Sequence, residues 1–346
     1  MLKKLLLGIA IGVFFIYLSF KGIDLKGITA GLKNANLFFV IPFLCLMVLI
    51  QMLKSYRWGI IMEPLMKIDQ FSLFSVTNVG FLAVIAIPAR IGELARPYLI
   101  STKTGISMSS AVGTVMVERV FDALTVLTVF FIVVLFTPLP PWLIRGSLIF
   151  LFLVLALLGL MVFLILRKET SLKILSPVVK LFPVKWHSRL TGLIDRFVDG
   201  FKIISHQRHM YYLVFLSISI WVIDAVAMYV LFFAFDIDLP LSAAFVLMAT
   251  IILGIAIPAA PGFVGNWHFF CVLGLGLFGI DKTGALTYAI VLHFLSIGII
   301  VILGLAFLPF NRFSLSDIKS KFSINSGEFV DPEKTHFTEQ NAGLEK

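Results

Sequence analysis

Three charged residues follow directly on a proline and glycine break in an apolar stretch. Arg90, Glu93 and Arg96 are interleaved with Pro88 and Gly92. At the centre of a bilayer each charge would cost roughly 2.5–3.5 kcal/mol on insertion scales, so the three must be paired, hydrated or near the interface. We interpret them as the lining of a polar cavity that could bind an anionic group through charge-assisted hydrogen bonds. The alternative is that they flank an ordinary membrane span.

A second group of charges interrupts a long helical stretch. Glu118 and Asp122 are four residues apart and share a helix face, and Arg119 lies beside them. An arginine balanced by two carboxylates can bind a phosphate group, or it can belong to a buried network that only stabilises the fold. Asp224 is a lone carboxylate near the middle of another apolar run. We expect it to face a basic partner, Arg90 or Arg119, inside the helix bundle.

Polar residues also accompany a second break. The residues of this break are Pro258, Pro261, Gly262 and Gly265. Proline removes a helical hydrogen bond and glycine tolerates the bend, so both breaks predict helices that stop at membrane depth. Asn266 and His268 follow the second break and are candidate site residues, whereas His293 is more typical of a hydrogen-bonded core histidine. With no third ligand at suitable spacing, no metal or other cofactor is expected.

The composition decides the environment of these residues. Of the 346 residues, 60% are hydrophobic and only 14% are charged, and the mean hydropathy is +1.04. These values exclude a water-soluble enzyme and are typical of an all-α membrane protein with many spans. The net charge of +9 indicates cytoplasmic loops that face anionic lipid rather than a nucleic-acid partner.

The charge of the loops predicts the topology. Residues 5–20 are interpreted as a retained first span, and the run that ends at Leu53 is closed by Lys54, Arg57 and Trp58, an interfacial anchor pattern. The basic stretch 167–208 is expected to be a cytoplasmic connector that contains an amphipathic helix. Residues 311–346 are polar and aperiodic, so we expect a disordered cytoplasmic tail, and the N-terminus is placed on the same side.

The chain also contains an internal repeat. The sequence IAIPA occurs at 85–89 and at 255–259, and Gly92 matches Gly262 at the same offset of 170 residues. An alternative register pairs Gly92 with Gly265. The repeat halves extend over about 64–137 and 236–308, and the expected fold has about six spanning helices plus two re-entrant broken-helix hairpins, inverted relative to each other.

Three ordered motifs carry a family resemblance. They read PARIGELARP, VERVFD and PGFVGNWH. In this order they resemble the lysylphosphatidylglycerol synthase transmembrane region, a family of flippase-like integral membrane proteins, over residues 1–310. Two positions depart from the family pattern, because Ala89 replaces a frequent Gly and His268 replaces a frequent Glu. Only a polar tail follows Asn311, so the soluble aminoacyl-transferring domain of the full synthases is absent, and we do not expect this chain to make an aminoacyl lipid.

The resemblance implies a protein of the cell membrane that handles a phospholipid or a polyprenyl phosphate. The charged and broken helices agree with a transporter, and no nucleotide-binding motif is present to drive it. One alternative is a membrane-embedded glycosyl or phosphoryl transferase that uses a lipid-phosphate donor, with Asp236 and Asp238 holding a divalent metal. Another alternative is a non-catalytic partner subunit.

Overall fold

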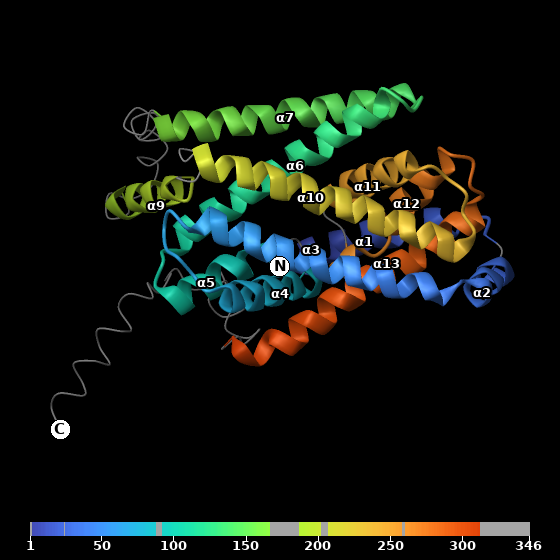
Figure 1. Ribbon diagram of the computed structural model, residues 1–346, viewed down its shortest axis with the longest axis horizontal. Helices are drawn as coiled ribbons and strands as arrows, with labels where there is room; N and C mark the ends of the chain where they lie inside the picture. The colour runs from blue at the N-terminus through green and yellow to red at the C-terminus, as the bar shows by residue number, and fades with distance from the viewer. Residues whose placement is uncertain are drawn as a thin grey trace.

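The protein is described by a computed structural model that covers residues 2–23, 25–87, 92–166, 187–201, 207–257 and 260–311. These residues form helices and connecting loops, with no strand among them (Figure 1). The first helices are α1 (Leu2–Phe20), α2 (Leu25–Asn34), α3 (Val40–Met62), α4 (Gln70–Ala86), α5 (Ala95–Thr104), α6 (Met108–Val134) and α7 (Pro141–Leu166). They are followed by α9 (His187–Asp199), α10 (Gln207–Phe232), α11 (Leu241–Ala256), α12 (Asn266–Gly276) and α13 (Lys282–Phe307). Short 3₁₀ turns cover Leu37–Phe39, Phe233–Phe235, Pro261–Phe263 and Leu308–Phe310.

Four helical stretches of the described chain are long and apolar enough to cross a membrane. They are Leu37–Met62, Pro141–Leu164, His209–Phe235 and Lys282–Phe310. The predicted all-helical membrane architecture is therefore confirmed. Helix α6 has 27 residues, which is a sufficient length, but it carries Glu118, Arg119 and Asp122 at its centre. The count of six spans stays a prediction.

The same order of helices occurs twice in the chain. One succession is α3, α4, a break, α5 and α6, and the other is α10, α11, a break, α12 and α13. The matched helices have similar lengths, with 17 and 16 residues in α4 and α11 and 10 and 11 residues in α5 and α12. Seventeen residues of α-helix extend about 25 Å, which is less than the roughly 30 Å of hydrocarbon core. Helices α4 and α11 are thus shorter than the four stretches that are long enough to cross a membrane.

The contacts between the two successions are symmetric, so that each contact has an equivalent in which both helices are the counterparts of the first two. Helix α4 packs against α13 and α11 packs against α6, while α3 and α10 pack against each other. In Figure 1, α4 and α5 lie towards the left of the molecule, and α11 and α12 lie towards the right. Helix α4 also packs against the 3₁₀ turn Pro261–Phe263 of the second break.

Local sequence sets where several helices begin. Asp69 caps α4 by accepting a hydrogen bond from the backbone N–H of Ser72 (2.8 Å). Ser107 and Asp281 cap α6 and α13 in the same way. These caps stabilise the first turns of two long helices and one short helix, and so set the residue at which each helix begins.

The core consists of two apolar clusters separated by polar residues. On α3, one cluster contains Phe43, Met47 and Ile50, and the other contains Trp58, Ile61 and Met62. The polar residues 51, 54, 55 and 57 of α3 lie between these two sets. The charged residues of α6 and α10 occur near the middle of their helices. Together these residues form the charged layer in which the site lies.

Helix α9 packs against the first turns of α6. The hydroxyl of Ser110 donates a hydrogen bond of 2.7 Å to the backbone carbonyl of Arg196, and Val198 and Phe201 are buried. The amphipathic pattern predicted this helix but not its contact with α6. Residues 167–186 and 202–206 of the predicted connector, and residues 312–346 of the predicted tail, lie outside the described residues.

Candidate functional site

Glu118 lies at the centre of the charged layer and accepts hydrogen bonds from two arginines. Arg96 of α5 approaches it with both terminal nitrogens, Nη1 to Oε1 at 2.8 Å and Nη2 to Oε2 at 3.0 Å. Both side chains are buried, at 2% and 0% exposure. Arg119 adds a third bond, from Nη2 to Oε1 of Glu118 at 2.9 Å. The parallel pair from Arg96 fixes the plane of the carboxylate, which a single bond would not do.

Arg57 is a member of this site that sequence interpretation assigned wrongly. We had expected Arg57 to anchor the end of a span at the interface, but its side chain has 0% exposure. Its Nη1 donates to Oδ1 of Asp122 (2.7 Å) and to the hydroxyl of Ser217 on α10 (2.9 Å), and its Nη2 lies 3.7 Å from Glu118. The anchor interpretation fails because α3 continues to Met62, which places Arg57 inside the helix bundle.

The arginines outnumber the carboxylates that hold them. Arg57, Arg96 and Arg119 lie against Glu118 and Asp122, so these five side chains together carry a net charge of +1, before the nearby Glu93 is counted. The Nε–H groups of all three arginines are buried and have no hydrogen-bond partner among the described residues. Buried donors without partners are costly, so this site has donor groups that an anionic ligand could satisfy.

Arg119 is the arginine that remains accessible. Its side chain is 40% exposed, and its Nη1 lies 3.7 Å from Oδ2 of Asp122. Glu93, a half-buried residue that follows the first break, also acts on Arg119 electrostatically. Arg119 is therefore the guanidinium that a headgroup can reach without unfolding the network around Glu118.

Aromatic side chains frame the arginines. The guanidinium of Arg96 lies over the ring of Trp58 at 4.3 Å and over that of Phe81 at 5.3 Å. The indole of Trp58 donates to Thr114 (3.1 Å), and the indole of Trp221 donates to Oδ1 of Asp122 (3.0 Å). Cation–π contacts of this kind stabilise a desolvated arginine and hold its plane.

Arg96 crosses α4 at Gly80, and this contact gives the first prediction. A Cβ atom at Gly80 would overlap with the side-chain Cγ of Arg96. The variant Gly80→Ala should push Arg96 away from Glu118 and lower the free energy of unfolding by about 1–3 kcal/mol. Thermal unfolding of the purified protein in detergent measures this change. The control is Gly298→Ala on α13, where a Cβ meets no atom within 4 Å, and equal stability of the two variants would contradict the prediction.

The structure describes one of the two partners expected for Asp224. Among the described residues, the charge of Lys54 on α3 acts on Asp224, and no ion pair joins Asp224 to Arg119. Arg90, the other expected partner, lies outside the described residues, as do Pro88 and Pro258. Lys54 also belonged to the predicted interfacial anchor. Its ammonium lies 5.6 Å from the ring centre of Trp221 on α10, inside the helix bundle, which corrects that interpretation for the same reason as for Arg57.

The second break has its own network. The amide of Asn266 donates to the backbone carbonyls of Gly254 (3.0 Å) and Ile257 (3.3 Å), and so satisfies groups freed at the end of α11. The ring of His268 accepts from the N–H of Gly265 (3.4 Å) and lies 4.6 Å from the ring of His293. These polar groups hold the backbone of the break in place.

The conformations of the break glycines explain their residue type. Gly262 and Gly265 have φ values of 66° and 98°, which side chains rarely adopt. Nε2 of His293 donates to the carbonyl of Gly262 at 2.7 Å, so the interpretation of His293 as a hydrogen-bonded residue agrees with its contact. Pro261 begins the 3₁₀ turn that contains Gly262. At the first break, a Cβ on Gly92 would overlap with the carbonyl of Ala83, so only glycine permits this close approach.

The site residues of α3 and α10 that were not predicted have the same helical spacing as the predicted ones. Arg57 and Trp58 follow Lys54 by three and four residues, and on α10 Trp221 follows Ser217 by four residues and Asp224 follows Trp221 by three. Each set therefore forms one polar face on an apolar helix. A polar face of this kind inside a predicted span indicates an interior position, whereas an interfacial anchor needs only one or two such residues at the end.

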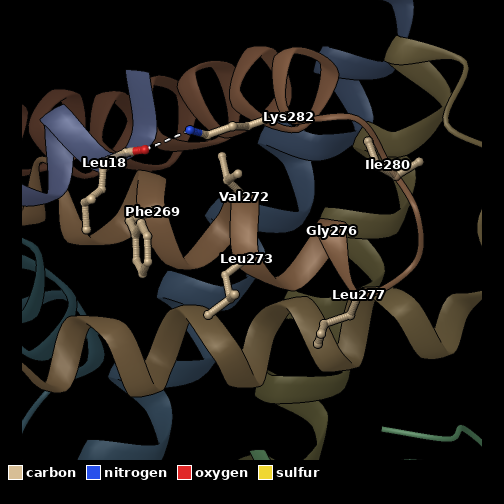
Figure 2. A pocket seen from close by; sticks show the side chains of 8 residues that line it. All are labelled: Leu18, Phe269, Val272, Leu273, Gly276, Leu277, Ile280 and Lys282. Carbon is tan, nitrogen blue, oxygen red and sulfur yellow. Dashed lines mark hydrogen bonds between the residues drawn. The ribbon is translucent and has the colours of Figure 1, made fainter. Parts of the chain in front are cut away.

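Two further features lie apart from the charged layer. Asp236 and Asp238 are exposed beyond the end of α10, and no group of three metal-binding side chains occurs within the described ranges. Figure 2 shows a pocket of about 430 Å³ lined by apolar residues of α1 and α12 and by Lys282. The ammonium of Lys282 donates to the carbonyl of Leu18 (2.9 Å), at the end of α1. The pocket shares no residue with the charged layer.

Long apolar helices, two broken helices and a buried charged layer define an integral multi-pass membrane protein. The chain belongs to the family described as the lysylphosphatidylglycerol synthase TM region, whose model matches residues 5–304. The family predicted from the three motifs is thereby confirmed.

Two relatives are UPF0104 membrane proteins of archaea. The protein of Methanocaldococcus jannaschii is 29% identical over 226 residues, which cover 63% of this chain and 89% of the relative. The protein of Methanothermobacter thermautotrophicus is 25% identical over 305 residues, which cover 83% and 89%. No solved structure matches this chain.

Proposed function

We propose that this protein moves a phosphate-bearing lipid, a phospholipid or a polyprenyl phosphate, across the membrane without nucleotide hydrolysis. The observation that carries the proposal is the charged layer, in which three arginines outnumber two carboxylates and keep buried N–H groups without partners. A phosphate offers both acceptor oxygens for the unpartnered N–H groups and a negative charge that balances the excess arginine.

The proposed substrate site consists of Arg119 as the accessible guanidinium, with the residues that hold or surround it. Glu118 and Asp122 orient Arg119, and Arg96 keeps Glu118 in place. We also assign Arg90, Glu93, Asp224, Asn266 and His268 to the wall of the lipid path. The headgroup would pass the arginines while the acyl or prenyl tails remain in the bilayer, so only the polar part of the lipid has to be desolvated.

The helix arrangement supports a path through the two breaks. We propose that α4 with α5, and α11 with α12, are re-entrant hairpins of an inverted repeat. Each of these four helices is short, and α4 packs against the last helix of the other half just as α11 packs against α6. Backbone that is not helical at membrane depth survives against a protein-lined or hydrated path. We assign the end of the molecule that contains α5 and α9 to the cytoplasmic side of the cell membrane, because the basic connector joins the helices there.

A liposome assay tests this function. The purified protein is reconstituted into liposomes in which a fluorescent lipid occupies both leaflets, and a membrane-impermeant reductant then removes the fluorescence of the outer leaflet. We expect the protein to bring labelled phosphatidylglycerol from the inner leaflet to the outer leaflet, where the reductant removes its fluorescence. Protein-free liposomes should keep about half of their fluorescence. Labelled ceramide, which has no phosphate, is the matched control lipid.

Two outcomes would contradict the proposal. Equal acceleration of ceramide would show that the protein only disturbs the bilayer, and no acceleration of any phosphate lipid would refute lipid movement. The assay also separates the transferase alternative. Lipid movement should persist with EDTA and in Asp238→Asn, whereas a metal-dependent transferase would lose its activity in both cases.

A further inference from the structure

Lys54 belongs to the charged layer and lies where α3 packs against α10. Its ammonium is 5.5 Å from the ring centre of Phe81 and 5.6 Å from that of Trp221, and it has no hydrogen bond to any of the described residues. Asp224 exerts the strongest attraction on it and Asp122 the next strongest, while Arg119 and Arg57 repel it. Lys54 therefore interacts with one carboxylate inside the proposed phosphate site and with one outside it.

Asp224 is a half-buried carboxylate on α10. Within the part of the chain that the structure describes, Lys54 of α3 is the one cation whose charge acts on it. From α13, Tyr288 faces Asp224, but its hydroxyl donates to the carbonyl of Met228 (2.8 Å); from α12, Cys271 is buried beside Tyr288. Helix α11 contains no titratable side chain. The ionisation of Asp224 therefore changes the balance of charge mainly at Lys54.

Trp221 connects Asp224 to the site. Its indole N–H donates to Oδ1 of Asp122, its ring faces Lys54, and Asp224 follows it by three residues, less than one turn of α10. Trp221 thus lies against Lys54, binds Asp122 and stands within one helix turn of Asp224. The charge of Asp224 acts on Lys54 electrostatically, without a direct ion pair.

We propose that Asp224 is a proton-binding site that is coupled through Lys54 to the phosphate site, so that a proton and the phosphate-bearing lipid bind together. This inference rests on the proposed function and adds the coupling ion to it. The proton comes from the aqueous phase and is held by the carboxylate of Asp224. No other bond is formed or broken, and the proton leaves when the lipid does.

The physical basis is a change in net charge. With Asp224 ionised, its negative charge offsets part of the positive charge of Lys54 beside the arginine cluster. With Asp224 protonated, Lys54 adds its charge to the cluster, which then attracts a phosphate more strongly. Linkage makes the effect reciprocal, because a bound phosphate attracts Lys54 and favours the protonated form of Asp224.

Binding of labelled phosphatidylglycerol to the purified full-length protein in a neutral detergent tests the coupling. Its phosphodiester has no second ionisation near pH 6, unlike a phosphate monoester, so the charge of the ligand stays constant. Affinity is measured from about pH 4.5 to about pH 8, a range that covers carboxylates and imidazoles. We expect wild-type affinity to rise about 10-fold as the pH falls, a typical size for coupling between two sites.

The variants identify the responsible group. Asp224→Asn mimics the protonated side chain and should bind with the high affinity at every pH, whereas Lys54→Gln should bind with the low affinity at every pH. Asp236→Asn is the matched control, since Asp236 is exposed beyond the end of α10 and asparagine tolerates its left-handed conformation, with φ at 50°. It should behave like the wild type.

Each remaining outcome has a distinct meaning. A pH dependence that survives in Asp224→Asn, or that disappears in His268→Gln instead, would overturn the coupling while the proposed function stands. No binding of phosphatidylglycerol at any pH in the wild type would overturn the proposed function and the coupling with it. Chromatography of each variant confirms that it is folded before its affinity is compared.

Discussion

Arg119→Gln is expected to abolish movement of phosphatidylglycerol in liposomes, and Arg119→Lys to retain part of it. The side chain of Arg119 is 40% exposed, while those of Arg57 and Arg96 are at most 2% exposed and are occupied by buried carboxylates. Glutamine removes the charge that receives the headgroup. Lysine keeps the charge but loses the planar fork that can bind two phosphate oxygens at once.

The readout is the rate at which labelled lipid changes leaflets, per folded protein. Arg145→Gln is the matched control, because Arg145 is an exposed arginine on α7 and lies outside the charged layer; it should leave the rate unchanged. Asp122→Asn should reduce the rate by weakening the orientation of Arg119, and also that of Arg57. A folded Arg119→Gln protein with the wild-type rate would indicate that the charged layer is a structural network only.

Glu118→Gln is expected to destabilise the fold more than any other single change in the site. Glu118 is the shared counterion of Arg57, Arg96 and Arg119, and its side chain is fully buried. Glutamine has nearly the same size, but it removes the carboxylate that holds the buried Arg57 and Arg96 and the partly exposed Arg119, and Asp122 then remains for Arg57 and Arg119. Removing one partner of a buried ion pair costs about 3–5 kcal/mol, because the other charge stays buried without compensation.

Thermal unfolding in detergent and the yield of monodisperse protein measure this loss. The control is Glu63→Gln, since Glu63 is partly exposed and pairs with the exposed Lys67 at 3.4 Å; this change should alter the free energy of unfolding by less than about 1 kcal/mol. If Glu118→Gln unfolds at the wild-type temperature, the arginines are held by contacts other than this carboxylate.

Local patterns of sequence were enough to predict much of the fold. The length of the apolar runs predicts membrane helices, because a bilayer accepts only backbone that satisfies its own hydrogen bonds. The residues Gly92, Gly262 and Gly265 predict breaks, since proline and glycine change the backbone where they stand. Glu118, Arg119 and Asp122 could be recognised as one group because neighbours on a helix remain neighbours in any fold.

Only the tertiary structure decided which charges meet. Arg57 contacts Ser217, a residue 160 positions away, and the charge of Lys54 on α3 acts on Asp224 of α10. These pairs exist because α3 and α10 lie side by side, an adjacency that no local pattern contains. The free energy of a buried charge depends on the partners that surround it. The sequence by itself therefore determined the helices, their breaks and the charges they carry, whereas helix packing decided which charges balance and which arginine remains accessible.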